Sequence, residues 1–321
     1  MINQKTVFIL GAGSSYPYGY PLGEQLRIEI CERFPMDYQN WLENAPKIPE
    51  LRRSEEEIKL MVQFAHDFVQ KFDDSHTKSI DLFLAGNKDF ERLGKLAIIF
   101  RILFAEHDSD FGHRSKIPDQ DWYFWLFNQM RNEIVKQEDY SRFCENTISF
   151  VTFNYDRSLE HFLFTSLNNS FNAISYEEIT KQMNAIKIVH VFRPIAPLEW
   201  QDRQRGIEYK RPINSIFVEA LAQHLKIIYD ESESPELKEA QGLIQEADRI
   251  FFLGFGYAPE NVSILKLSEI LNKQRIYGTA LGLTNRERVE IESRLRSMTN
   301  GAKGSVVIAD TDCLMLLRTY L

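Results

Sequence analysis

The sequence is poor in cysteine and in positive charge. Only 3 cysteines occur among 321 residues, widely separated, which excludes a disulfide framework or a four-cysteine zinc site and favours a reducing cytoplasm. Lys and Arg number 38 against 46 Asp and Glu, so the net charge is −8 and direct nucleic-acid binding is not expected. The richest apolar stretch, residues 96–104, contains Arg101 and is too short to cross a bilayer. These features predict a soluble, cytoplasmic protein without membrane contact.

Six short apolar runs, rich in β-branched and aromatic residues, alternate with segments of helical spacing. The runs are 7–10, 148–153, 186–192, 250–255, 276–283 and 305–309. Continuously apolar strands separated by helices are typical of a parallel sheet that is covered on both faces. We therefore expect an α/β fold: a Rossmann-like parallel sheet of about six strands with helices on both faces, interrupted by a large helical insertion.

The interval between the first and second runs is far longer than one crossover requires. Inside it, an apolar helical face begins after Ser54 and three acidic residues, which suit a helix cap and first turn. The residues of this face are Ile58, Met61, Val62, Ala65, Phe68, Val69 and Phe72. The sequence thus predicts a nucleotide-binding core formed by residues 1–35 and 146–321, with a helical insertion subdomain at 36–145.

The first run leads into a glycine turn followed by small hydroxyl residues. The turn consists of Gly11, Ala12, Gly13, Ser14 and Ser15. Glycine lets the backbone approach a pyrophosphate closely, and the free amides at the start of the next helix complement its negative charge. The third glycine of the dinucleotide fingerprint and its acidic strand end are both missing, which disfavours a nicotinamide dehydrogenase. A tight strand-to-helix turn without a ligand is the alternative.

Three further runs end in residues that suit a site. Gly254 and Gly256 follow the fourth run, so two glycine turns are expected to converge at the carboxyl edge of the sheet, where ligands of such folds bind. Asn154 and Asp156 follow the second run, where a turn and a helix cap are the plainer explanation. His190 lies at the third run, and a lone strand histidine is more often a hydrogen-bonded core residue than a catalyst.

These motifs, in this order, resemble those of the sirtuin family, whose founder is silent information regulator two. The family carries Gly-Ala-Gly-x-Ser, then Gln-Asn-x-Asp, a catalytic histidine, Gly-Thr-Ser, an asparagine and Gly-Asp-x-Asp at successive strand ends. The counterparts lie at 11–15, 153–156, 190, 254–256, 283–285 and 309–312. The sequence is more similar to a bacterial branch found in anti-phage defence, through Thr-x-Asn-Tyr-Asp, Gly-x-Pro and Asp-x-Phe-Leu at 152–156, 19–21 and 81–84.

The resemblance implies an NAD⁺ glycohydrolase that releases nicotinamide and ADP-ribose and depletes NAD⁺ in abortive infection. Asn154 would position a water or the ribose hydroxyls, His190 would take a proton, and Asp156 would orient the ribose end or support the turn. The implied NAD⁺-binding residues are Gly11, Ala12, Gly13, Ser14, Ser15, Gly254, Gly256, Thr284 and Asn285. NAD⁺ enters as the substrate, and no metal is expected. A homo-oligomer and a HerA-like ATPase or nuclease partner are implied as well.

Two differences from deacylating sirtuins disfavour lysine deacylation. The zinc-binding cysteine pairs are absent, and Pro21 is followed by Leu22 and Gly23 where those enzymes have Asp-Phe-Arg. The alternatives to an NAD⁺ glycohydrolase are a protein deacylase or ADP-ribosyl transferase, and a non-catalytic module that senses NAD⁺ or ADP-ribose.

Overall fold

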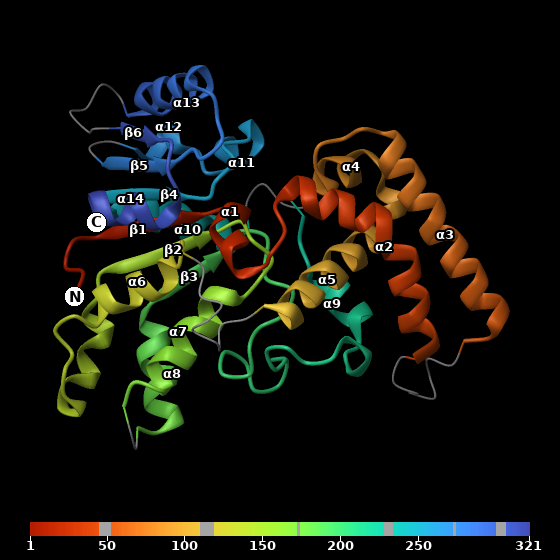
Figure 1. Cartoon of the computed structure of the whole chain (residues 1–321), viewed down its shortest axis with the longest axis horizontal. Coiled ribbons are helices and arrows are strands. Elements are labelled where there is room, and N and C mark those ends of the chain that lie inside the picture. Colours follow the sequence, from red (N-terminus) through yellow and green to blue (C-terminus); the bar gives the residue numbers. More distant parts are fainter. Residues whose placement is uncertain (45–52, 110–118, 172–173, 228–233, 272–273, 300–305) are drawn as a thin grey trace. The chain divides into compact units, whose positions relative to one another are not determined.

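In the computed structural model, the chain forms two compact units (Figure 1). The described residues are 1–44, 53–109, 119–171, 174–227, 234–271, 274–299 and 306–321. Unit 1 comprises Met1–Tyr18, Asp110–Val191 and Ser232–Leu321, and unit 2 comprises Gly19–Ser109 and Phe192–Glu231. Within the described ranges, no helix combines the length and the apolar character that crossing a membrane requires.

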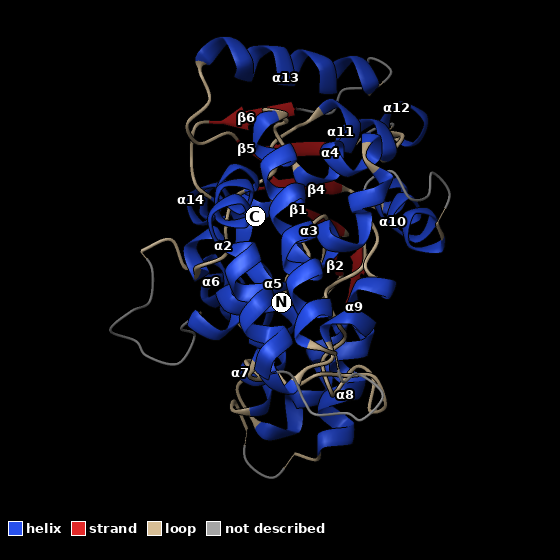
Figure 2. Ribbon diagram, turned by 90° about the vertical axis from the view of Figure 1, so that its right-hand side faces the viewer, coloured by secondary structure: helices blue, strands red, loops and turns tan. Residues whose placement is uncertain are grey.

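Unit 1 is built on a six-stranded parallel sheet. Its strands are β1 (Thr6–Leu10), β2 (Ile148–Thr152), β3 (Lys187–His190), β4 (Arg249–Leu253), β5 (Arg275–Thr279) and β6 (Val306–Ala309). They lie in the order β3-β2-β1-β4-β5-β6, and each neighbouring pair is parallel. Figure 2 shows these strands side by side from β6 to β2. The predicted Rossmann-like α/β fold is confirmed.

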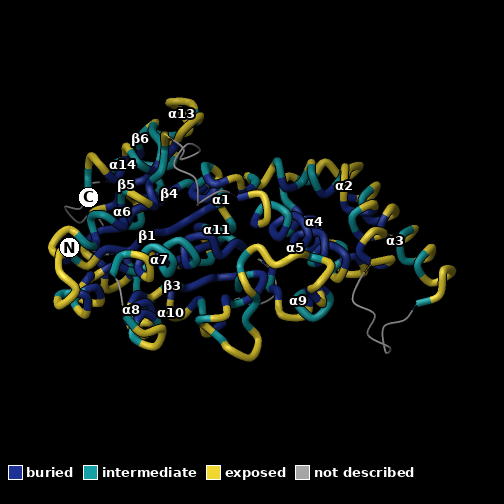
Figure 3. Tube along the Cα trace, turned by 60° about the horizontal axis from the view of Figure 1, so that its bottom comes forward, coloured by how far each residue is buried: buried dark blue, intermediate teal, exposed yellow. Residues whose placement is uncertain are grey.

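The centre of the sheet is fully buried. All residues of β1 and β4 are buried, as the continuous apolar runs predict, and Figure 3 shows the buried colour along β1. Phe8 packs between Phe150 and Phe251 of the flanking strands, with ring centroids 5.2 and 5.5 Å away. Several predicted runs extend past the observed strand ends, because apolar residues also fill the following turns. Phe153 and Phe255, whose ring centroids lie 5.1 Å apart, are buried in the turns after β2 and β4.

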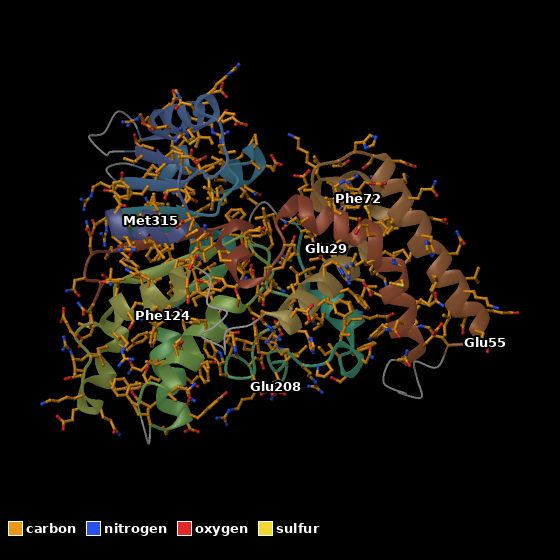
Figure 4. All side chains as sticks on the ribbon, viewed as in Figure 1. Glu29, Glu55, Phe72, Phe124, Glu208 and Met315 are labelled. Carbon is orange, nitrogen blue, oxygen red and sulfur yellow. The ribbon has the colours of Figure 1, made fainter. Side chains whose placement is uncertain are left out.

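Helices cover both faces of this sheet. They are α1 (Ala12–Ser15), α6 (Trp122–Met130), α7 (Ser158–Asn168), α8 (Tyr176–Ala185), α10 (Pro235–Glu246), α11 (Pro259–Ile264), α12 (Leu267–Ile270), α13 (Asn285–Met298) and α14 (Cys313–Tyr320). Helix α6 contacts α7 and α14, whereas α12 contacts α10 and α13. Because crossovers between parallel strands are right-handed, the helices between β1 and β3 lie on the opposite face from those between β3 and β6, and α14 joins the first group through its contact with α6. Phe124 of α6 and Met315 of α14 are exposed on the outside of their layer (Figure 4).

Unit 2 is helical and has an aromatic core. Its helices are α2 (Gly23–Asn44), α3 (Glu55–Asp74), α4 (Ile80–Gly86), α5 (Glu91–Asp108) and α9 (Val218–His224). Ser54 caps α3, because its side chain accepts from Glu57 N–H, and the Glu57 carboxylate accepts from Ser54 N–H. This helix therefore begins where the sequence predicts. Glu55 lies in the first turn of α3 and the buried Phe72 in its last (Figure 4). Phe72 packs against Phe68 and Phe83 inside the unit.

The two units divide the chain differently from the expected core and insertion. Residues 36–109 of the expected insertion belong to unit 2, whereas 110–145 belong to unit 1, which includes α6. Helix α2 runs unbroken from Gly23 to Asn44 and therefore carries residues of the expected core into unit 2. Residues 192–231 join unit 2 because α9 packs on α5.

The turns after β1 and β4 pack backbone against backbone at the carboxyl edge of the sheet. Gly11 N–H donates to Leu253 O at 3.1 Å, and Gly13 N–H donates to Gly254 O at 3.0 Å. A Cβ atom on Gly254 would lie 2.0 Å from Ser14 N, and Gly254 has a φ of +57°, which favours glycine. Position 254 therefore requires glycine both for its backbone conformation and for the space its neighbours leave.

We expect Gly254→Ala to destabilise the protein by about 2–5 kcal/mol, through left-handed strain of roughly 1–2 kcal/mol and overpacking of roughly 1–3 kcal/mol. The matched control is Gly242→Ala in α10, where a Cβ would meet nothing within 4 Å. That substitution should stabilise the protein by about 0.5–1 kcal/mol. Urea unfolding followed by circular dichroism measures both, and equal midpoints for the two variants would contradict the assigned contact.

Candidate active site

The strand order defines one point where a ligand pocket is expected. From β1 the chain runs outward to β2 and β3, and it then crosses to β4 on the other side of β1. In open parallel sheets, ligands bind at the carboxyl ends of the strands where the order reverses in this way. The two glycine turns meet there, between β1 and β4, as the sequence predicts. Asn154 follows β2, and His190 ends β3 at the same edge.

The first glycine turn is held by contacts from several sides. Gly11 caps the four-residue helix α1, and Ser14 Oγ donates back to Gly11 O at 2.8 Å. Trp122 Nε1–H of α6 donates to Ser14 O at 2.8 Å. Because Gly13 N–H donates to Gly254 O, that amide is engaged by the protein itself. The turn is therefore a rigid, preformed element.

Asn154 joins the end of β2 to this turn. Its Nδ2 donates to Gly11 O at 3.1 Å and reaches Ser14 Oγ and Ser15 Oγ at 3.3 Å each. A backbone carbonyl only accepts hydrogen bonds, so the atom facing Gly11 O must be the amide nitrogen, and this fixes the orientation of the side chain. The half-buried Asn154 thereby directs its Oδ1 away from the turn. No hydrogen bond to Oδ1 is formed among the described residues, so this oxygen is the acceptor left for a ligand.

Asp156 is buried and engaged by its neighbours. Its Oδ1 accepts hydrogen bonds from the backbone N–H of Ser158 at 3.0 Å and from Ser158 Oγ at the start of α7. Burial raises the pKa of Asp156, although hydrogen bonds from Ser158 and Ser15 lower it. Asp156 thus ties the start of α7 to the glycine turn. The N-cap of this helix is Arg157, and not Asp156 as the capping explanation expected, and Asp156 bonds to the first helical residue. A direct role of Asp156 at a ribose stays a prediction.

His190 uses both ring nitrogens within the protein. Its Nδ1 lies 2.9 Å from the backbone oxygen of Asn154, and its Nε2 lies 2.5 Å from Glu160 Oε1. The histidine is 8% exposed and Glu160 is 2% exposed. His190 is therefore buried, yet it is linked to the glycine turn through Asn154.

Opposing effects set the protonation of His190. Burial lowers its pKa, but the Glu160 carboxylate, the Asn154 carbonyl and Asp156 raise it, so the pKa lies above the ordinary value of 6.5. A proton on Nδ1 satisfies the carbonyl, and a proton between Nε2 and Oε1 satisfies the carboxylate. In this arrangement His190 has no free lone pair with which to accept a proton from a ligand.

The expected residues at the next strand ends lie outside these contacts. Thr284 caps α13, because its Oγ1 accepts a hydrogen bond from the backbone N–H of Glu287 at 3.3 Å, and Asn285 begins that helix. Thr284, Asn285 and Gly256 are all exposed. Among the described residues, no hydrogen bond joins these three to the first glycine turn. Their assignment as NAD⁺-binding residues stays a prediction.

The sequence reasoning missed Glu160. It lies in the first turn of α7 and shares the inward face of that helix with Leu163 and Leu167, three and seven residues later. A carboxylate at an apolar-face position was the available signal, because an ion is buried only with a partner. Trp122 was missed as well, since nothing in its local sequence points to a carbonyl more than a hundred residues away.

The described residues contain no group of three or more His, Cys, Asp or Glu side chains arranged to hold a metal ion. No protein-family model matches the sequence, and none of the curated proteins is significantly similar to it. The site must therefore be interpreted from its own geometry.

The orientation of Asn154 can be tested by stability. In Asn154→Asp, a carboxylate oxygen would face Gly11 O, so we expect a loss of about 1–3 kcal/mol at neutral pH and a smaller loss for Asn154→Ala. Asn132→Asp, at an exposed position of unit 1, is the matched control and should change stability by less than about 0.5 kcal/mol. Thermal unfolding at pH 7 ranks the stabilities of the wild type and these variants. An Asp variant as stable as the wild type would refute the donor role of Nδ2.

Proposed function

We propose that unit 1 is an NAD⁺ glycohydrolase that cleaves NAD⁺ to nicotinamide and ADP-ribose. The observation that carries the proposal is the meeting of two glycine turns at the β1/β4 switch point, with Asn154 bonded to the first of them. A dinucleotide is the ligand class that suits glycine-lined backbone at this place in a parallel sheet. The ordered motifs that resemble sirtuins support the same ligand.

The chemistry requires little nucleophilic power. The bond between C1′ of the ribose and the pyridinium nitrogen breaks, its electron pair stays on the nitrogen, and neutral nicotinamide leaves. A water oxygen bonds to C1′ and its proton passes to solvent. Orientation of the ribose and of this water supplies most of the rate enhancement. Asn154 Oδ1 accepts a hydrogen bond from a ribose hydroxyl or from the water, since its Nδ2 is engaged by the turn.

His190 has a positioning role in this proposal, in place of the proton acceptor expected from the sequence. Its Nδ1–H donates to the Asn154 carbonyl, while Glu160 occupies Nε2. The histidine therefore fixes the backbone of Asn154 from behind. Asp156 and Ser158 fix the following turn in the same way.

Both ring nitrogens of His190 are engaged within the protein, and this favours a second candidate, a module that binds NAD⁺ or ADP-ribose without turnover. A glycohydrolase without a free base at the site depends on Asn154 alone for direct contact with the reacting groups. If Asn154 only orients the ribose, the same geometry binds the ligand and leaves it intact. The two candidates differ in whether nicotinamide is released.

The biological setting follows from the resemblance. It favours NAD⁺ depletion in the cytoplasm during anti-phage defence, a homo-oligomer, and a HerA-like ATPase or nuclease as a partner. The net charge of −8 supports a partner, and not this chain, as the contact to nucleic acid.

Incubation with NAD⁺, followed by chromatography of nicotinamide and ADP-ribose, tests the function. We expect Asn154→Ala to lower turnover by about 100-fold, because an oriented group at the reacting centre is lost. Asn168→Ala, at an exposed position near the end of α7, should retain wild-type turnover. Release of nicotinamide only with an acylated lysine peptide or a protein acceptor selects the deacylase or transferase. Recovery of bound, intact NAD⁺ after long incubation selects the sensing module.

A further inference from the structure

His190 and Glu160 form a buried ionisable pair, which the packing of a protein core does not require. Glu160 Oε1 lies 2.5 Å from His190 Nε2, and the side chains are 3% and 7% exposed. Burying two ionisable groups carries a large desolvation cost, and an apolar pair of similar volume often gives equal stability. The location of the pair, one hydrogen bond from Asn154, points to a purpose at the site.

We propose that Glu160 is a positioning residue whose carboxylate keeps both ring nitrogens of His190 protonated, so that His190 Nδ1–H holds the Asn154 carbonyl and thereby directs the Asn154 side chain. This inference rests on the proposed hydrolase function and names the residue that prepares its central asparagine.

The argument depends on the strength of one hydrogen bond. A donor that carries charge makes a hydrogen bond roughly twice as strong as a neutral donor does. With Glu160 present, the bond from His190 Nδ1 to Asn154 O is charge-assisted at a length of 2.9 Å. Without the carboxylate, burial removes the charge from the imidazole, and the neutral ring is free to carry its single proton on Nε2 instead.

The other groups that face His190 act in the same direction but more weakly. Asp156, on the turn before α7, raises the pKa of His190 after Glu160 and the Asn154 carbonyl. Asp156 itself is held by Ser158 and has a pKa raised by burial. Glu160 is the group in direct contact with Nε2. Its replacement should therefore have the largest effect on the histidine.

The sign of the pH dependence follows from these directions. The folded-state pKa of His190 lies above its ordinary value of 6.5, so the stability that this group contributes is fully present below pH 6.5. It is lost as the pH rises through the folded-state pKa. The raised pKa of Asp156 acts in the same direction: its contribution to stability is present below its ordinary pKa of 3.8 and is lost as the pH rises through its folded-state pKa.

The test compares Glu160→Gln and Glu160→Leu with the wild type. Long-range ¹H–¹⁵N spectra of the imidazoles, recorded without NAD⁺, follow the titration of His190, which His190→Gln assigns among the 7 histidines. We expect Glu160→Gln to lower the pKa of His190, and Glu160→Leu to lower it and to shift the Asn154 side-chain amide signals as well. The matched control is Glu177→Gln, an exposed acidic residue in the first turn of α8, which should change neither.

The kinetic arm uses the same variants. We expect kcat for NAD⁺ hydrolysis to fall roughly 10- to 100-fold in Glu160→Leu with little change in KM, and less in Glu160→Gln, whose amide can still donate to Nε2. The pH at which kcat falls on the alkaline side should be lower in Glu160→Gln, in step with the lower pKa of His190. A purely structural role for Glu160 would leave the pH at which kcat falls unchanged.

The two arms separate the possible failures. A His190 titration unchanged in Glu160→Gln overturns the proposal, whether or not the protein hydrolyses NAD⁺. Unchanged kcat and pH profile in both variants of an active enzyme also overturn it. A wild type that releases no nicotinamide contradicts the hydrolase function alone, because the spectra of His190 and Asn154 are measured without substrate. If Glu160→Leu does not fold, the isosteric Glu160→Gln still decides the outcome.

Discussion

The close backbone contact between the two glycine turns is the constraint on which the candidate site depends. Gly254 approaches Ser14 N and Gly13 so closely that any side chain at 254 would collide with backbone atoms. This contact joins the ends of β1 and β4 at the point where the strand order reverses. It also fixes the carbonyl of Gly11, which in turn fixes the orientation of Asn154. A single packing contact therefore fixes the positions of the polar atoms at the candidate site.

Around this contact the protein buries several ionisable groups. The strands are held by apolar packing, such as Phe8 between its two aromatic neighbours. His190, Glu160 and Asp156 are nevertheless buried beside them. Because buried ionisable groups seldom increase stability over apolar residues, their concentration at one strand edge is a mark of a functional site. The hydrogen bonds from this cluster lead to Asn154 and to the glycine turn, and this direction is consistent with orientation of the site.

The fold was largely predictable from the sequence, and the site only in part. Six continuous apolar runs specify a parallel sheet because strands that are buried on both faces tolerate no polar alternation. The same rule predicted that β2 and β4 end later than they do, because the apolar residues Phe153 and Phe255 lie in the turns that follow these strands. Parallel strands bring their carboxyl ends to one edge, so the meeting of the glycine turns could be expected. The pairing of Glu160 with His190 could not, because it depends on how α7 packs against β3, which periodicity along the chain does not determine.

The proposed division of roles also answers an electrostatic difficulty. Departure of nicotinamide leaves positive charge on the ribose, and an isolated imidazolium nearby would oppose that charge. The partnership with Glu160 makes the buried pair neutral overall, while Nδ1–H remains a strong donor toward the Asn154 carbonyl. In the proposed site, the group that faces the ribose is Asn154 Oδ1, the negative end of an amide dipole. A histidine that is paired and buried thus serves this reaction better than one that is free and charged, provided that its task is to hold the asparagine.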